Sequence, residues 1–321
     1  LAVHQVAHAL AQFLHELGAH LRHLDPRAPA ARQLPVEHVA QATTHRLELP
    51  LPLSPEEQHI YATVRDAYRA QVYSAAETSS KGGPSLTMLE ALLRLRQASC
   101  HPSLLPFDEA KELGERAGSS KLRTVIDTLE EIISEGHKAL VFSQWTSLLD
   151  LTQAALKKSK IRTTRLDGST KDRGSVVEHF QSEDGPPVFL LSLKAGGTGL
   201  NLTAADYVIH LDPWWNPAIE AQANDRAHRI GQTRPVFVIK LVSDNTVEEK
   251  VVHLQKHKKA LFDAAINDGR ELEDLLTADE VASFFDPSEE IPEASKIEIP
   301  EPEPKRAKEK SDTVRRRRGR R

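Results

Sequence analysis

The stretch HKALVFSQWTSLLDLTQAALKKSKIRTTRLDGST, residues 137–170, decides the fold. Its first apolar run, residues 139–142, is short and free of polar residues, which is typical of a strand buried on both faces of a sheet. We expect a helix over residues 148–157 and a second strand over 161–166 to follow it. A strand, a helix and a strand in this order indicate parallel strands joined by a crossover helix.

The same alternation continues on both sides of this stretch. Towards the C-terminus we expect a helix at 175–180, strands at 188–193, 207–211 and 236–242, and helices at 217–230 and about 246–266. Towards the N-terminus, a helix capped by Ser119 or Ser120 ends at Gly136. The pattern predicts the α/β class, with a doubly wound parallel sheet and flanking helices over about residues 119–245.

The residues before 119 predict a mainly helical region. We expect an amphipathic helix at 3–24, a linker at 25–35, a strand at 45–49, and helices from Ser54-Pro55-Glu56-Glu57 and over about 86–98. His4 and His8 are spaced like two metal ligands, but no third ligand is placed, and a solvated helix face is favoured. We therefore expect no metal site here.

Composition excludes several classes of protein. The 321 residues contain one cysteine, Cys100, so an internal disulfide framework and a cysteine-based zinc finger are excluded. We expect Cys100 to be a buried structural thiol rather than a nucleophile paired with the adjacent His101. No apolar run approaches the ~18 residues of a membrane span, and no secretory leader is visible, so we expect neither a membrane partner nor secretion.

The net charge of −4 is unevenly distributed along the chain. Residues 286–304 are acidic and rich in proline, whereas residues 305–321 are basic and end in RRRRGRR. We expect 286–321 to be a disordered tail. Its basic end suits non-specific phosphate binding or nuclear targeting, and equally a solvated solubilising tail. Because the rest of the chain is mildly acidic, any nucleic-acid contact there must come from a local track.

Three side chains on the expected helix at 217–230 form the first candidate site. Gln222, Arg226 and Arg229 are spaced i, i+4 and i+7, which would place them on one helix face. Two guanidinium groups converging on one spot repel each other unless an anion lies between them, and their planar forks suit phosphate oxygens. The alternative is a surface ion-pair face that uses Glu220 and Asp225.

Three loops supply further candidates. The turn SLKAGGTGLN, residues 192–201, follows an expected strand, where open α/β sheets bind ligands, although it does not match the G-x-G-x-x-G fingerprint. The loop RLDGST, residues 165–170, is placed to receive a backbone phosphate; an ordinary strand-to-helix turn is the alternative. The loop DPWWNP, residues 212–217, holds two tryptophans, one for the core and the other for a partner or nucleic acid.

In their order along the chain, these stretches resemble the motifs of one family. LVFSQW at 140–145, residues 165–170 and 192–205, and QANDRAHRIGQ at 222–232 are similar to the C-terminal motor lobe of the Swi/Snf family of superfamily 2 DNA translocases. Residues 212–217 fit this family too, and LLRLRQASCHPSLL at 92–105 looks like the end of its first lobe. The resemblance covers about residues 45–285.

The resemblance implies a RecA-like lobe that closes on ATP and Mg²⁺ held mainly by a first lobe. Arg226 and Arg229 match the arginine fingers of the family, and Gln222 matches the glutamine of that motif. The turn residues matched to nucleotide binding are Gly197, Gly199 and Asn201, and Asp206 is a weaker match. Those matched to DNA contacts, or to coupling DNA with nucleotide, are Ser143, Gln144, Asp167, Gly168, Ser169, Thr170, Ser192, Lys194, Thr198 and Trp215.

The chain lacks the phosphate loop G-x-x-x-x-G-K-[ST] of an ATPase. Asp108-Glu109-Ala110-Lys111 resembles an acidic metal-binding box, but it follows prolines in an expected loop instead of a strand, so we interpret it as a decoy. We divide the chain into a helix and linker at 1–40, a helical end of the first lobe at 41–118, the second lobe at 119–285, and the tail at 286–321. This polypeptide alone is not expected to hydrolyse ATP at the rate of a motor.

These observations predict the second lobe of an ATP-dependent double-stranded DNA translocase of the chromatin-remodelling or DNA-repair type. Its partners would be duplex DNA, a first lobe in cis or in trans, and a nucleoprotein target. It would act in the nucleus of a eukaryote or at the nucleoid in a bacterial cytoplasm. The alternative is a non-catalytic DNA- or protein-binding remnant of such a motor. An unrelated Rossmann-like nucleotide binder is disfavoured because its glycine fingerprint is absent.

Overall fold

The computed structural model describes residues 43–77, 84–195, 200–229, 232, 234–257 and 276–287. The predictions for the helix at 3–24, the linker at 25–35 and the disordered tail beyond residue 287 lie outside these residues. So do Gly197, Thr198, Gly199 and the far end of the helix expected to reach 266. None of the helices in the described ranges is long and apolar enough to cross a bilayer.

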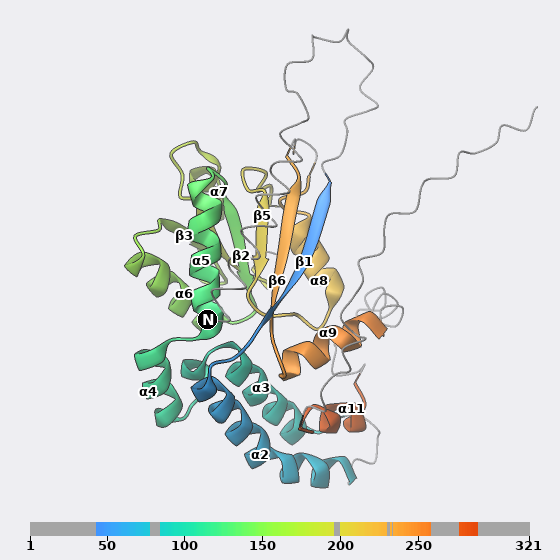
Figure 1. Cartoon of the computed structure of the whole chain (residues 1–321). Coiled ribbons are helices and arrows are strands. Elements are labelled where there is room, and N and C mark those ends of the chain that lie inside the picture. Colours follow the sequence, from blue (N-terminus) through green and yellow to red (C-terminus); the bar gives the residue numbers. More distant parts are fainter. Residues whose placement is uncertain are drawn as a thin grey trace, which may run out of the picture. The chain divides into compact units, whose positions relative to one another are not determined.

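Six strands form one sheet in which each hydrogen-bonded pair is parallel. The order across the sheet is β1-β6-β5-β2-β4-β3 (Figure 1). Their bounds are Thr44–Leu51 for β1, Ala139–Ser143 for β2, Thr163–Leu166 for β3, Val188–Ser192 for β4, Tyr207–His210 for β5 and Val236–Ser243 for β6. The predicted doubly wound parallel sheet is confirmed, and β1, from the segment before residue 119, joins it beside β6.

The central strands are buried on both faces, and their side chains alternate between two apolar clusters. Val141 of β2 packs with α5 (Ser120–Ser134) and α6 (Thr146–Lys158) on one face. Phe142, its neighbour, packs with α7 (Arg173–Gln181) and α8 (Pro217–Asn224) on the other face. Because successive side chains of a strand point to opposite faces, an all-apolar run such as 139–142 supplies both clusters at once.

A separate helical layer lies at the carboxyl ends of the strands (Figure 1). It consists of α2 (Pro55–Glu77), α3 (Leu86–Cys100), η1 (Pro102–Leu104), α4 (Asp108–Ala117) and α11 (Ala278–Ser283), and it contacts α9 (Val247–His257). Ser243 Oγ, at the end of β6, donates to the Ser99 carbonyl oxygen of α3 at 2.8 Å. Glu57 completes the predicted capping box with Ser54 and also accepts from Ser120 N at 3.0 Å, so α2 and α5 begin at one point.

Two local predictions are wrong. The helix expected at 217–230 ends at Asn224, where the backbone tightens: Arg226 N and Ala227 N donate to carbonyl oxygens three residues earlier. The Arg226 carbonyl accepts from Leu202 N at 3.0 Å, so this segment is bonded to a distant loop. Asp108-Glu109-Ala110-Lys111 was expected in a loop but forms the first turn of α4. No strand precedes it directly, so the interpretation of these acids as a decoy metal box keeps its physical basis.

Candidate nucleic-acid interface

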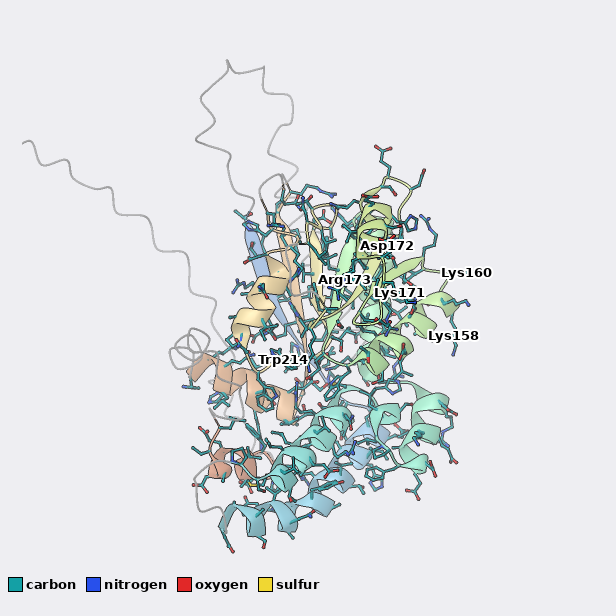
Figure 2. The ribbon with its side chains drawn as sticks, turned by 180° about the vertical axis from the view of Figure 1, so that it is seen from behind. Lys158, Lys160, Lys171, Asp172, Arg173 and Trp214 are labelled. Atoms are coloured by element: carbon teal, nitrogen blue, oxygen red, sulfur yellow. The ribbon has the colours of Figure 1, made fainter. Side chains whose placement is uncertain are left out.

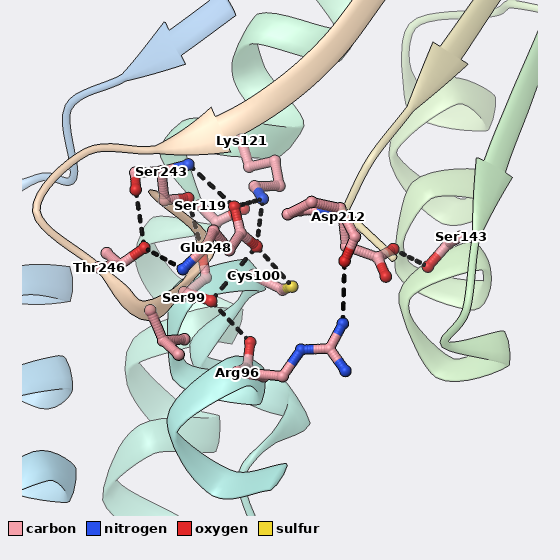
Figure 3. A network of polar contacts seen from close by, with 12 residues as sticks. Arg96, Ser99, Cys100, Ser119, Lys121, Ser143, Asp212, Ser243, Thr246 and Glu248 are labelled. Atoms are coloured by element: carbon pink, nitrogen blue, oxygen red, sulfur yellow. Dashed lines mark hydrogen bonds and ion pairs between the residues drawn. The ribbon is translucent and has the colours of Figure 1, made fainter. Parts of the chain in front are cut away.

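The loops that follow β2 and β5 are joined through a buried carboxylate. Ser143 Oγ donates to Asp212 Oδ1 at 2.6 Å (Figure 3). Gln144 N lies 3.3 and 3.4 Å from the two oxygens of the same carboxylate. Burial raises the pKa of Asp212 to about 6, against the opposing influence of the Ser143 hydrogen bond and of the Arg96 charge. Ser143 is thus held by Asp212, and its hydroxyl oxygen in turn accepts from Trp145 N at 3.0 Å.

The loop at 165–170 is organised from within by Asp167. One carboxylate oxygen accepts from Ser169 N at 2.9 Å and from Ser169 Oγ at 2.6 Å, and the other accepts from Arg165 Nε at 2.8 Å. The hydrogen bonds from Ser169 hold the pKa of Asp167 below its usual range, so the group is an anion. Asp167 therefore shapes the loop, while Gly168 and Ser169 are exposed at its tip.

Basic side chains continue this surface beyond the loop. Lys171 and Arg173 are exposed around Asp172, which caps α7 by accepting from Ser175 N at 3.0 Å. Figure 2 shows these three residues grouped together, with Lys158 and Lys160 at the outer edge of the molecule. No role was predicted for Lys158 or Lys160; the run KKSK at the end of the helix was the available signal.

The turn after β4 is described only up to Ala195. Ser192 is buried and accepts from Ala195 N at 3.1 Å, so its hydroxyl oxygen serves the turn itself. Lys194 is exposed. Arg173 Nη1 donates to the Ala195 carbonyl at 3.4 Å, which brings the 165–173 segment and this turn together. Asn201 is exposed on the far side of the turn, and its carbonyl accepts from Gln181 at 3.1 Å.

Arg226 and Arg229 follow α8 in a series of turns, whereas Gln222 is exposed on α8 itself. Arg226 is buried, with 5% of its surface exposed, and its Nε has no hydrogen-bond partner among the described atoms. Burial and then the neighbouring charge of Arg229 lower the pKa of Arg226. Arg229 is exposed, and its Nη1 donates to the Leu200 carbonyl at 3.3 Å. The Arg229 charge thus acts on the Arg226 guanidinium, and Arg229 itself reaches the 200–202 segment.

Gln232 braces this arginine segment, a role that was not predicted. Its Nε2 lies 3.1, 3.0 and 3.3 Å from the carbonyl oxygens of Thr203, Ala205 and Ala227, while Oε1 accepts from Arg234 N at 3.0 Å. One side-chain amide therefore joins the segment that carries Arg226 to the loop before β5. The only signal in the sequence was its place at the end of the arginine motif.

The two tryptophans of the 212–217 loop have different surroundings. Trp215 is 7% exposed and packs in the helical layer, 5.8 Å from the ring of Phe284. Trp214 is partly exposed and packs against the cluster on the α7 and α8 face (Figure 2). Of the two, Trp214 offers surface to a ligand, and Trp215 connects the loop to the helices.

A metal centre is not formed by the described residues, which contain no group of three histidine, cysteine or acidic side chains. Cys100 is buried, as predicted, and its thiol lies 3.2 Å from Glu248 Oε1. Burial and the Glu248 charge raise the pKa of this thiol well above its usual range, so it is not a thiolate nucleophile.

Comparison with known proteins adds a family to this geometry. The model of the helicase conserved C-terminal domain matches residues 120–231. Over 177 residues, 54% of this chain, the sequence is 46% identical to the DNA repair protein RAD5 of Cryptococcus neoformans, of which the match covers 15%. Across this and seven other curated relatives, the aligned part spans 13% to 24% of the relative's length.

Two solved structures resemble this chain over most of its length. The Sulfolobus solfataricus SWI2/SNF2 ATPase core in complex with dsDNA is 31% identical, with a TM-score of 0.62, covering 76% of this chain and 50% of that one. The C-terminal domain of the Sulfolobus solfataricus SWI2/SNF2 ATPase is 28% identical, with a TM-score of 0.59, covering 76% of this chain and 99% of that one. These likenesses confirm the resemblance that the motifs predicted, together with the RecA-like fold.

Proposed function

Since this chain carries a Snf2-family helicase C-terminal domain, we propose that it is the second lobe of an ATP-dependent motor that translocates on double-stranded DNA. One observation carries the proposal. The loops after β2, β4 and β5 and the start of α7 are linked by hydrogen bonds at the carboxyl edge of the sheet, where open parallel sheets bind ligands. The similar Sulfolobus ATPase core is in complex with dsDNA, which supports duplex DNA as the partner.

We assign two roles to this edge. Gln144 and the exposed tip of the 167–170 loop would contact the DNA backbone, with amide donors directed at phosphate oxygens. Ser143, predicted as a DNA contact, is buried and donates its hydroxyl to Asp212, so it would instead hold the loop after β2 in place. Ser192, Lys194, Thr198 and Trp215 would transmit that contact to the nucleotide, and Lys171 and Arg173 extend the cationic surface. These contacts involve no base edges, so binding is expected to depend strongly on salt and weakly on sequence.

Arg226 and Arg229 would supply the second role. Arg229 reaches the 200–202 segment, the Arg226 backbone is bonded to Leu202, and the burial of Arg226 strengthens its interaction with any anion that approaches. When the first lobe closes on this edge, these guanidinium groups would stabilise the charge that develops on a phosphoryl group in transfer. Gln222, Gly197, Gly199 and Asn201 would complete that side of the cleft. ATP and Mg²⁺ are held mainly by the first lobe in this proposal.

These two roles on one lobe would couple ATP hydrolysis to movement on duplex DNA. Closure of the two lobes places the arginines and shifts the DNA-contacting loops together, since Arg173 touches the turn that carries Lys194. Repeated closure would move the lobe along the backbone without separating the strands. We place this activity in DNA repair or chromatin remodelling, in the nucleus of a eukaryote or at the nucleoid of a bacterium.

Two measurements on the 321-residue chain test the proposal. Fluorescence anisotropy with a labelled duplex of about 30 base pairs should show binding that weakens steeply between about 50 and 200 mM salt and is similar for unrelated sequences. A steady-state ATPase assay should show turnover only when a first lobe is supplied, in cis or in trans. Absence of DNA binding at low salt would refute the proposal, and robust ATP turnover by the chain alone would refute the division of labour. A non-catalytic remnant would bind DNA but would not restore turnover to a first lobe.

A further inference from the structure

Arg96 of α3 is buried between the helical layer and the DNA-facing loops. Its side chain is 6% exposed, and no ion pair joins it to a carboxylate among the described residues. Its Nη1 donates to Gln144 Oε1 at 3.1 Å, and its Nη2 donates to the Pro213 carbonyl at 3.0 Å. One guanidinium group therefore holds the loop after β2 and the loop after β5 at the same time.

Aromatic rings form the rest of its surroundings. The guanidinium carbon lies 4.9 Å from the ring centre of Trp215, 5.8 Å from that of Trp145 and 5.9 Å from that of Trp214. These are all three tryptophans of the chain. The faces of indole rings attract a cation, which offsets part of the cost of burying this charge. We call the group of Arg96 and the three indoles the tryptophan cage.

The cation fixes the orientation of the Gln144 amide. A guanidinium can only donate hydrogen bonds, so Gln144 must turn its oxygen towards Arg96 and its nitrogen away from it. Gln144 Nε2 is buried and has no acceptor among the described atoms. Trp145 Nε1 is also buried and also lacks an acceptor among them. Buried donors are normally paired, so two unpaired donors on adjacent residues of one loop require an explanation.

We propose that Arg96 is a positioning residue for DNA binding, which directs the N–H donors of Gln144 to a backbone phosphate and holds the 143–145 and 213–215 loops in register. The inference rests on the proposed function. Both donor nitrogens are covered in the DNA-free chain, so the contact requires a shift of the 143–145 loop. Because Arg96 belongs to α3, the helical layer would then sense that shift.

A purely structural role does not account for these contacts. Burial lowers the pKa of Arg96, the nearby Asp212 charge opposes this only in part, and an apolar residue of similar length would pack there at lower cost. Both of its polar contacts instead go to loops at the candidate interface, and neither goes to its own helix. Arg94, two residues earlier, has only local partners, Gln97 and Glu90, and provides a matched control.

The experiment compares binding of a labelled duplex by the 321-residue chain and its variants, with tryptophan emission as a second readout. Arg96→Met and Gln144→Leu should each weaken binding roughly tenfold to a hundredfold, the loss of about one hydrogen bond to a charged group. The double variant should bind no worse than either single variant, because both changes remove the same contact. Arg96→Lys should lose about half of the effect, since one ammonium cannot reach both acceptors, and Arg94→Met should bind normally.

Emission reports the cage itself, because it holds every tryptophan. DNA should shift the emission of the wild-type chain and of Arg94→Met, and the shift should be absent in Arg96→Met. Unchanged DNA affinity in Arg96→Met, or losses that add in the double variant, would overturn the inference even if thermal stability falls. If Arg96→Met fails to fold, Arg96→Lys and Gln144→Leu decide the same question. Failure of the wild-type chain to bind DNA would instead refute the proposed function.

Discussion

Two clusters of charge in this chain, each around a buried cation, are built in opposite ways. Around Glu248, the Lys121 ammonium is 2.6 and 2.7 Å from the two carboxylate oxygens, and Ser243 N adds a bond of 2.9 Å (Figure 3). At the arginine segment, Arg226 and Arg229 bring two like charges together, and Arg226 Nε has no partner among the described atoms. Lys121 thus has a carboxylate partner, whereas the buried Arg226 forms no ion pair among the described residues.

The pKa shifts of the two buried cations make the same distinction. Burial lowers the pKa of Lys121, but the negative groups around it, Glu248 foremost, together more than offset burial, so the net shift is upward. Burial and Arg229 both lower the pKa of Arg226, so the folded chain disfavours its charge. A buried cation whose charge the folded state favours, such as Lys121, has a structural role. A buried cation whose charge the folded state disfavours, such as Arg226, is a candidate for binding an anionic ligand.

Replacement of Arg226 should have the largest effect, and the effect should be on turnover. In a motor completed by a first lobe, Arg226→Met should lower ATP turnover by roughly 10³ to 10⁵, while the free energy of unfolding changes by less than about 1 kcal/mol. The methionine keeps most of the apolar stem, and the variant loses the repulsion from Arg229. Arg162→Met, on an exposed arginine that contacts the Asp184 carbonyl, should leave turnover unchanged. If Arg226→Met instead lost stability and kept its ATP turnover, Arg226 would have a structural role, as Lys121 does.

Replacement of Lys121 should have the opposite outcome. Lys121→Met leaves Glu248 buried without its counter-ion, and the free energy of unfolding measured in urea should fall by about 3 to 5 kcal/mol. Lys256→Ala breaks the exposed pair with Glu48 and should cost less than about 1 kcal/mol. Adding Glu248→Gln to Lys121→Met removes the stranded charge and keeps an acceptor for Ser243 N, so much of the loss should return. Equal losses for Lys121→Met and Lys256→Ala would show that the Glu248 cluster does not stabilise the fold.

Much of the sheet was predictable because burial on both faces leaves a local signal. The apolar runs at 139–142, 188–193 and 207–211 each became a central strand, β2, β4 and β5, close to the expected bounds. The prediction of a helix over 217–230 was too long. After Asn224 the chain forms tighter turns, and the Arg226 carbonyl accepts from Leu202 N, a distant donor that periodicity cannot show. The pairing of β1 with β6 likewise joins segments far apart in the sequence.

The candidate site was predictable in its motifs but not in its supports. Ser143, Gln144 and Arg226 stand out by residue type and order. The groups that hold them do not, because a buried arginine on a helix looks like any polar residue of that helix. Arg96 reaches Gln144 and Pro213 over separations of 48 and 117 residues, and only the folded chain reveals that link. Asp212 was visible as the start of DPWWNP, yet its role in holding Ser143 needed coordinates.

Asp212 gives the smallest and most specific test, because it lies near Arg96 and Lys121 but forms an ion pair with neither among the described contacts. Its pKa is raised from 3.8 to about 6 in the folded chain, so the native state binds a proton more tightly than the unfolded state between these values. The cost of ionising Asp212 is therefore present at pH 7 and shrinks as the pH falls. In Asp212→Asn that cost is absent at every pH.

When the pH falls from 7 to 5, the wild type should become more stable relative to Asp212→Asn. The difference between their free energies of unfolding should change by about 1 to 2 kcal/mol. Subtraction removes the titration of the other carboxylates, Asp244 included, which both proteins share. Urea unfolding at several pH values measures this difference. A constant difference would mean that Asp212 is neutralised by the cations around it. That result would place Asp212 with the Glu248 cluster, whose buried charges are paired. Buried cations without an ion pair among the described residues would then be limited to Arg226 and Arg96.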